Sequence, residues 1–335
     1  MIGGGDGDTN NQTDSHTQRQ RDAAGDDDAF VDPHFFDHDY SVATTTGFCR
    51  VWEGAEVLAR IMDEDEESVG TSDQSLLPDL RNRRVLELGA GVGLVGIAAA
   101  SKGAHVMLTD VPAVVDEVLL RNISENLEET RSSDASEAPA SSTDGSNTST
   151  GWHGALPVIG GNGGTATAQP LDWCKGIDEQ MQSRKELFNS AMTRREEELK
   201  NGDAQSAAFW QKRAGLPVND PRSAEIILAA ECLWLRELLD PFVDTVYELL
   251  TRGNAETCIL SFRDRSTNES IESSHAEPTL ELNTGNNESA FVPVKDVTEA
   301  FSKKGCSYRT IQKINSTIDP GFHVHVFEIF VERRV

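Results

Sequence analysis

The stretch Val85–Ser101, VLELGAGVGLVGIAAAS, constrains the fold more than any other part of the chain. A short apolar run leads into four glycines, Gly89, Gly91, Gly93 and Gly96, and an alanine-rich segment follows them. Glycines let the backbone approach a ligand closely, and the N-terminus of a helix adds N–H groups and a positive dipole end. The stretch therefore predicts a buried strand, a ligand-holding turn and a helix.

The rest of the chain continues this alternation. A strand is expected at 105–110, a helix at 114–127 and a further strand near 165–173. Later strands are expected at 225–235 and 256–265, each followed by a helix, and an amphipathic helix precedes the glycines at 51–62. Two final strands, 308–314 and 323–335, have no helix between them and should pair antiparallel. Alternating side chains along 323–330 predict that the second of them is half-buried. The sequence predicts an α/β fold with a Rossmann-like sheet of about seven strands, mostly parallel with an antiparallel last strand, and helices on both faces.

Polar tracts interrupt this pattern. Residues 1–29 form an acidic tail that cannot bury a core, and 131–151, 175–216 and 265–290 read as polar inserts, the second of them helical. We therefore expect a single domain over 30–335 that carries three inserts.

Charge and cysteine usage limit the partners. The net charge of −26 repels nucleic acid and anionic lipid, so neither is expected as a partner, whereas it suits a basic protein segment. The five cysteines form no CxxC pair, so neither a metal site nor a disulfide framework is expected. The N-terminus lacks an apolar signal segment, and no run reaches the length of a membrane helix. These features predict a cytoplasmic or nuclear protein; they leave the oligomeric state open.

The glycines alone leave two ligands open. Gly91–Gly96 matches GxGxxG, and Asp110 ends the next strand, where a carboxylate can accept both ribose hydroxyls of NAD or of S-adenosylmethionine. Glu87 favours the second ligand, because a carboxylate there repels a pyrophosphate and attracts ammonium and sulfonium cations. Glu87 could instead cap the helix that follows. The antiparallel ending also departs from an all-parallel dinucleotide fold.

Six segments occur in this order along the chain: TGFCRVWEGAEVLA, VLELGAGVGLVGIAAA, HVMLTD, LDW, AAECLWL and ILSFRDR. In these segments the chain resembles the seven-β-strand S-adenosylmethionine-dependent methyltransferases, and most closely methyltransferase family 16. That family includes protein-lysine methyltransferases and nicotinamide N-methyltransferase-like members. The resemblance covers about 44–335 without the inserts.

The resemblance implies a set of residues that bind S-adenosylmethionine. Trp52 would lie near its methionine part, the turn Gly89-Ala90-Gly91 beneath it, and Asp110 on the ribose. The adenine would lie beside the Asp172–Trp173 pair, with the acid accepting from the exocyclic amine; Ala230 and Glu87 complete the implied cofactor set.

The family's Asp-x-x-Tyr is Glu231-Cys-Leu-Trp234 in this chain, which leaves the substrate open. Glu231 and Trp234 are the candidate catalytic residues: the carboxylate would hold an incoming ammonium, and the indole would line the alkyl chain. The leading hypothesis is a protein-lysine N-methyltransferase. Alternatives are a small-molecule, nicotinamide-like N-methyltransferase, a non-catalytic cofactor-binding module and, less favoured, an NAD oxidoreductase.

Overall fold

A computed structural model describes residues 50–68, 75–127, 151–158, 162–215, 217–233, 235–264 and 292–332. All of them belong to one compact unit, Thr44–Val335. Three of the predicted polar segments lie outside the described residues: the tail 1–29, the insert 265–290, and the insert 131–151 apart from Gly151.

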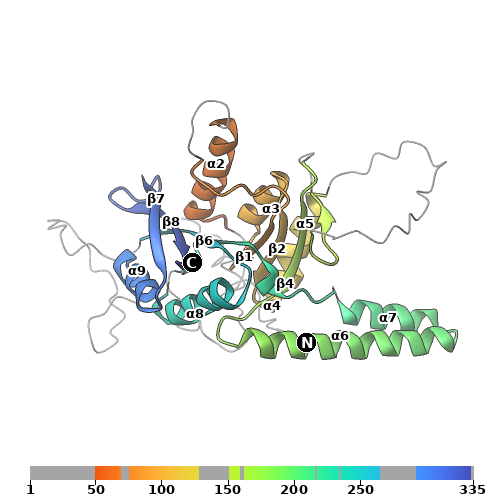
Figure 1. Cartoon of the computed structure of the whole chain (residues 1–335). Coiled ribbons are helices and arrows are strands. Elements are labelled where there is room, and N and C mark those ends of the chain that lie inside the picture. Colours follow the sequence, from red (N-terminus) through yellow and green to blue (C-terminus); the bar gives the residue numbers. More distant parts are fainter. Residues whose placement is uncertain are drawn as a thin grey trace, which may run out of the picture. The chain divides into compact units, whose positions relative to one another are not determined.

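The described strands form one sheet in the order β3-β4-β2-β1-β5-β6-β8-β7 (Figure 1). Their bounds are β1 Arg84–Leu88, β2 His105–Asp110, β3 Leu156–Pro157, β4 Thr165–Pro170, β5 Ile226–Ala230, β6 Thr257–Arg263, β7 Ser307–Asn315 and β8 His323–Phe330. The five central strands, from β4 to β6, run parallel, whereas β3 pairs antiparallel with β4, and β8 pairs antiparallel with both β6 and β7.

The predicted fold class is confirmed, with one strand more than expected. The additional strand, β3, contains only a Leu-Pro pair at the edge of the sheet. A two-residue segment has no periodicity that a sequence pattern could detect.

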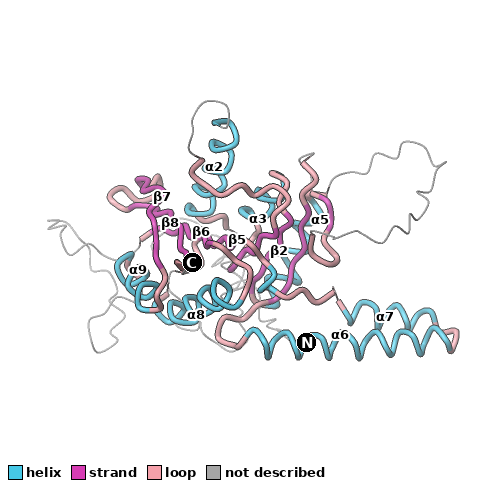
Figure 2. Tube along the Cα trace, viewed as in Figure 1, coloured by secondary structure: helices cyan, strands magenta, loops and turns pink. Residues whose placement is uncertain are grey.

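Helices cover both faces of the sheet, as Figure 2 shows. Their bounds are α2 Glu53–Ser68, α3 Leu94–Ser101, α4 Pro112–Val114, the π-turn η1 Val115–Leu119, α5 Leu120–Glu125, α6 Ile177–Lys200, α7 Ala204–Ala214, the 3-10 turn η2 Pro221–Ser223, α8 Arg236–Arg252 and α9 Val294–Lys303. One hydrophobic cluster joins the sheet to α2, α3 and the helix of α4, η1 and α5; the other joins it to the start of α6, α8 and α9. Two covered faces explain why the central strands read as continuous apolar runs.

Two expectations about individual elements need correction. The amphipathic helix expected at 51–62 begins at Glu53 and continues to Ser68, so Trp52 precedes it. The alternation in β8 suggested a half-buried strand, but apolar side chains are buried on both faces: Val324 and Val326 pack in one cluster, Phe327 and Ile329 in the other. The second face is covered because α8 and α9 pack against it.

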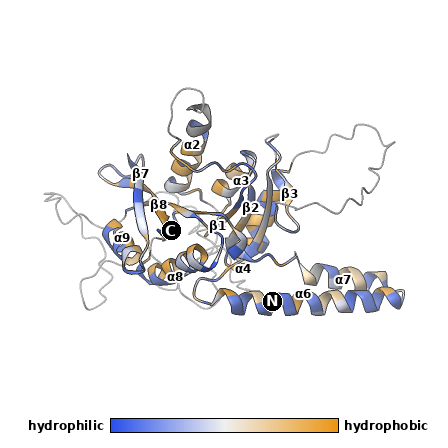
Figure 3. Cartoon of the chain, in the orientation of Figure 1, coloured by the Kyte–Doolittle hydropathy of each residue, from blue (hydrophilic) through white to orange (hydrophobic). Residues whose placement is uncertain are grey.

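The insert expected at 175–216 is a helical hairpin of α6 and α7, which lie side by side in Figures 1 and 2. Hydrophilic residues predominate along α6 (Figure 3). Within the described part of the chain, no helix has the length and apolar character that a membrane span requires.

Candidate functional site

The candidate site lies where β1 and β5 end. From β1 the chain continues outward to β2 and β4, and it then returns to the other side of β1 as β5. This is the switch point of an open parallel sheet, where the loops leaving neighbouring strands diverge and leave room for a ligand. The glycine turn follows β1, and Glu231 follows β5.

The glycine turn has a left-handed backbone and one open position. Gly89 and Gly91 have φ values of 65° and 54°. A methyl group on Gly89 would come within 2.6 Å of Cys232 Cβ, whereas one on Gly91 would meet no atom of the described residues within 4 Å. The turn is held by the Ala90 N–H, which donates to Thr109 O at 3.0 Å. The protein is therefore packed against Gly89 and open above Gly91.

Asp110 fixes this turn from the end of β2. Its Oδ2 accepts the Gly91 N–H at 2.8 Å, and its Oδ1 accepts the Val111 N–H at 2.7 Å. Burial raises the pKa of Asp110, and these two hydrogen bonds oppose that effect. Asp110 thus ends β2 and stands beside Gly91, and its contact with a ribose stays a prediction.

Glu87 lies beneath the turn and is 2% exposed. Its Oε2 accepts the N–H of Gly96, in the first turn of α3, at 2.9 Å. Gly96 has no side chain to separate them, and a Cβ there would collide with this oxygen. Burial raises the pKa of Glu87 to about 8, and the neighbouring Asp110 adds to this effect. The structure thus gives Glu87 the helix-capping contact that the sequence offered as an alternative.

Asp172 and Trp173 follow β4. The Asp172 carboxylate accepts the Cys174 N–H at 2.9 Å and pairs with Lys175 Nζ at 2.8 Å. The Trp173 ring lies edge-on to Phe242, with 5.1 Å between centroids, and its six-membered ring would be 3.2 Å from a Cβ on Gly89. The predicted adenine loop is therefore in contact with the glycine turn.

Ala230 ends β5 and Glu231 follows it, and both are buried, at 9% and 5% exposure. Glu231 has a φ of 55°, which is unusual for a residue other than glycine. Its Oε1 accepts the N–H of Gly54 at 3.0 Å and the N–H of Arg263 at 2.9 Å. Glu231 was expected to face a substrate; the structure shows that one of its oxygens holds the first turn of α2 against the end of β6.

A second buried carboxylate beside it was missed by sequence reasoning. Glu53 is 4% exposed, and its carboxylate accepts three hydrogen bonds: from Ser316 Oγ at 2.6 Å, from the Thr317 N–H at 2.5 Å and from Thr317 Oγ1 at 2.9 Å. Burial raises its pKa, but these bonds and the charge of Arg263 outweigh burial, so the pKa lies below its usual range. An acid directly after Trp52 was the available signal.

Arg263 completes this cluster. Its Nη1 lies 2.8 Å from Asp319 Oδ2 and 3.8 Å from Glu53 Oε2. Glu53, Glu231 and Arg263 thus join the start of α2, the ends of β5 and β6, and the β7–β8 turn. Trp52 directly precedes this cluster, with Arg50 stacked on its ring at 5.4 Å. Trp234 lies outside the described residues.

Comparisons with known proteins match the part of the chain that carries the glycine turn. Residues 41–138 match the family model described as lysine methyltransferase. Protein N-lysine methyltransferase METTL21A of Danio rerio is 42% identical over 82 residues, which cover 24% of this chain and 32% of the relative. EEF1A lysine methyltransferase 3 of Mus musculus is 32% identical over 89 residues, covering 25% and 34%. The family resemblance seen in the sequence is thereby confirmed over the part that carries the glycine turn.

The chain matches about a third of the length of these curated relatives. Among solved structures, magnesium protoporphyrin IX methyltransferase from Synechocystis PCC 6803 aligns over 89% of this chain and 97% of its own, with 10% identity and a TM-score of 0.40.

Proposed function

We propose that this protein is an S-adenosylmethionine-dependent protein-lysine N-methyltransferase. The observation that carries the proposal is the glycine turn at the switch point, packed under Gly89, open above Gly91 and flanked by the Asp110 carboxylate. The match to a lysine methyltransferase family over 41–138 supports the same reading.

The residues at this site fit S-adenosylmethionine. The open position at Gly91 leaves room for it, and Asp110, next to that position, would accept from the ribose hydroxyls. Asp172 and Trp173 would hold the adenine. Trp52 and the Gly89–Gly91 turn would hold the methionine part, and Ala230 would line the pocket between the two parts. When bound, S-adenosylmethionine supplies a methyl group activated by a sulfonium charge.

Glu87 also belongs in this proposal. Its pKa of about 8 means that the side chain is largely protonated at pH 7 without a ligand. A cation nearby would favour the charged form, so we expect Glu87 to release a proton when the cofactor binds.

The chain's own contribution to methyl transfer is to position a neutral amine. A lysine ammonium has no lone pair, so it must lose its proton before it can attack. Glu231 would attract the ammonium to the end of β5 with a charge whose position is fixed by two backbone N–H groups. Solvent can take the proton, so Glu231 needs no raised basicity. Trp234 would line the alkyl chain. Alignment of this kind supplies several kcal/mol of a displacement barrier.

We propose a basic protein segment as the substrate, because a net charge of −26 attracts one, and a cytoplasmic or nuclear location. The same charge disfavours nucleic acid and anionic lipid as partners. No contact described above favours a small-molecule amine, a non-catalytic module or NAD chemistry over the lysine reading.

Calorimetry with S-adenosylhomocysteine and NADH tests the cofactor, and Glu231→Gln tests the amine site. We expect S-adenosylhomocysteine to bind and NADH not to bind. Glu231→Gln keeps an oxygen for the Gly54 and Arg263 N–H groups but removes the charge, so cofactor affinity should change little while turnover falls. Binding of NADH alone would exclude the proposed cofactor; full turnover of the variant would exclude Glu231 from the amine site.

A further inference from the structure

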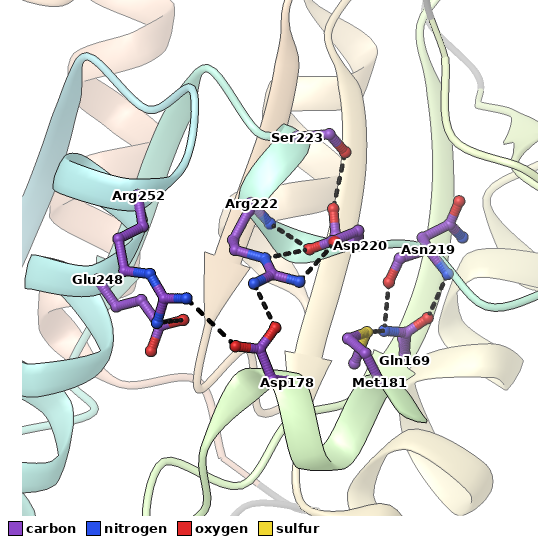
Figure 4. Close-up of polar contacts among 9 residues, drawn as sticks. All are labelled: Gln169, Asp178, Met181, Asn219, Asp220, Arg222, Ser223, Glu248 and Arg252. Atoms are coloured by element: carbon purple, nitrogen blue, oxygen red, sulfur yellow. Dashed lines mark hydrogen bonds and ion pairs between the residues drawn. The ribbon is translucent and has the colours of Figure 1, made fainter. Parts of the chain in front are cut away.

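The base of the α6–α7 hairpin is attached to the sheet by contacts from its first two turns. Figure 4 shows one side of this base, where Asp178 pairs with Arg222 at 2.5 Å and Met181 meets the amide of Gln169. Ile177 and Met181 are buried in the core beneath α8. Farther along α6, Ala191 is the only other described side chain that is buried. The hairpin is thus anchored at one end.

Gln180, in the same two turns, forms hydrogen bonds with the loop that follows β4. Its Oε1 accepts the N–H of Asp172 at 2.8 Å, and its Nε2 donates to Asp172 O and to Lys175 O, each at 2.8 Å. A neutral amide is the side chain suited to this task, because it presents an acceptor to the N–H and donors to the two carbonyls. The Asp172 N–H thus donates to Gln180, and the Asp172 carbonyl accepts from Gln180 and, at 3.2 Å, from the Lys175 N–H.

Arg184 adds a contact one turn later. Its Nη1 donates to Pro170 O at 3.3 Å, and Pro170 is the partner of Asp110 in the pairing of β2 and β4. The inserted helix therefore touches the chain at the end of β4 and in the loop directly after it.

This loop forms one wall of the candidate site. Its Trp173 ring packs over Gly89, and its Asp172 carboxylate is oriented by Cys174 and Lys175. Since the Asp172 backbone is held by Gln180, the direction of that carboxylate depends on a residue of the insert. The hairpin is thus part of the support of the site.

We propose that Gln180 is a positioning residue for the adenine end of the cofactor site, through which the α6–α7 hairpin sets the orientation of the Asp172 carboxylate. This inference rests on the proposed function, because it assumes that an adenine lies against this loop. It adds that the insert helps to determine which base is accepted.

The test compares Gln180→Met and Gln180→Glu with the wild type and with Gln182→Met. Methionine keeps the length of the side chain and removes all three hydrogen bonds. Glutamate keeps the acceptor for the Asp172 N–H and sets an oxygen against two carbonyls. Gln182 lies two residues along the same helix, is exposed and bonds only to Glu186 in the contacts described, so it is the matched control.

Calorimetry with two probes separates positioning from a general loss of structure. The probes are S-adenosylhomocysteine and its inosine analogue, in which a carbonyl replaces the exocyclic amine. We expect both Gln180 variants to bind S-adenosylhomocysteine about tenfold more weakly, which corresponds to about 1.4 kcal/mol and is on the scale of one hydrogen bond. The inosine analogue should bind to the variants less than about threefold more weakly than to the wild type. Gln182→Met should leave both affinities unchanged.

Two results would overturn the inference: an unchanged affinity for S-adenosylhomocysteine in both folded variants, or an equal loss for both probes. Thermal unfolding by circular dichroism establishes that each variant is folded, and Gln180→Glu provides the test if Gln180→Met is not. A wild-type protein that binds neither probe would instead refute the proposed function itself.

Discussion

Glu87 offers a sharp physical test, because a carboxyl group buried to 2% exposure with a pKa of about 8 makes stability depend on pH. The folded-state pKa lies above the ordinary value of 4.5, so the folded protein keeps a proton that the unfolded chain loses. The stabilisation from this proton is fully present below pH 4.5 and is lost as the pH rises to about 8. Stability must therefore fall through this window.

The magnitude follows from the two values. The interval from 4.5 to about 8, at roughly 1.4 kcal/mol per pH unit, amounts to on the order of 5 kcal/mol. Most of the interval lies between pH 5 and pH 8.5, which gives a loss on the order of 4 kcal/mol over that range. Glu87→Gln keeps an oxygen for the Gly96 N–H and cannot ionise. The variant should lack this loss, so its advantage over the wild type should grow with pH.

Urea unfolding of both proteins at pH 5, 7 and 8.5 measures the effect. The free energies of unfolding should be similar at pH 5, and Glu87→Gln should be the more stable protein at pH 8.5. Other titrating groups are common to both proteins and cancel in the difference. Glu196→Gln, on an exposed position of α6, makes the same chemical change as a control and should leave the pH profile unaltered. A difference between Glu87→Gln and wild type that is constant from pH 5 to 8.5 would refute the reasoning.

Three further predictions concern the site. Asp110→Ala should lower affinity for S-adenosylhomocysteine by at least about a hundredfold, because two hydrogen bonds to a charged group contribute about 1.5–3 kcal/mol each. Asp110→Asn keeps an acceptor for the Gly91 N–H, so it separates loss of charge from loss of the turn. Unchanged calorimetric affinity in both variants would exclude ribose binding by Asp110. Gly91→Ala should cost only about 1–2 kcal/mol of stability, the strain of a left-handed residue, since its Cβ meets no atom within 4 Å in the part of the chain that the structure describes. It should nevertheless weaken ligand binding about tenfold or more, since the methyl group enters the open space, and calorimetry showing full affinity would place the ligand elsewhere. Glu53→Gln should destabilise the protein by about 2 kcal/mol at pH 7 through weaker bonds to Ser316 and Thr317. Because the folded-state pKa of Glu53 lies below 4.5, its stabilisation is present above pH 4.5 and is lost in acid, so the two proteins should converge there; a difference that persists at low pH would contradict the role of the charge.

The sequence predicted the parts of the fold that depend on local pattern. Apolar runs ending in glycine or aspartate gave β1 and β2, and the absence of a helix before the last strand gave its antiparallel pairing. Asp110 was expected at the end of the second strand, and it ends β2; in a strand-helix-strand unit the ends of parallel strands share one edge of the sheet.

The contacts that hold the site together could not be predicted in this way. Gly54 and Glu231 are 177 residues apart, and Glu53 and Ser316 are 263 apart. No periodicity relates such positions; they meet only because α2 packs across the ends of β5 and β6. Gln180 lies in an insert whose composition suggested only a solvated helix. Its role becomes visible once the start of α6 is seen against the loop after β4.

Transfer of a labelled methyl group tests the central claim most directly. The full chain is incubated with S-adenosylmethionine labelled in the methyl group and with cell lysate protein, and modified peptides are located by mass spectrometry. We predict label on the Nζ of lysine in a protein, and none with Asp110→Ala. Label confined to small molecules, or to residues other than lysine, would contradict the proposed function.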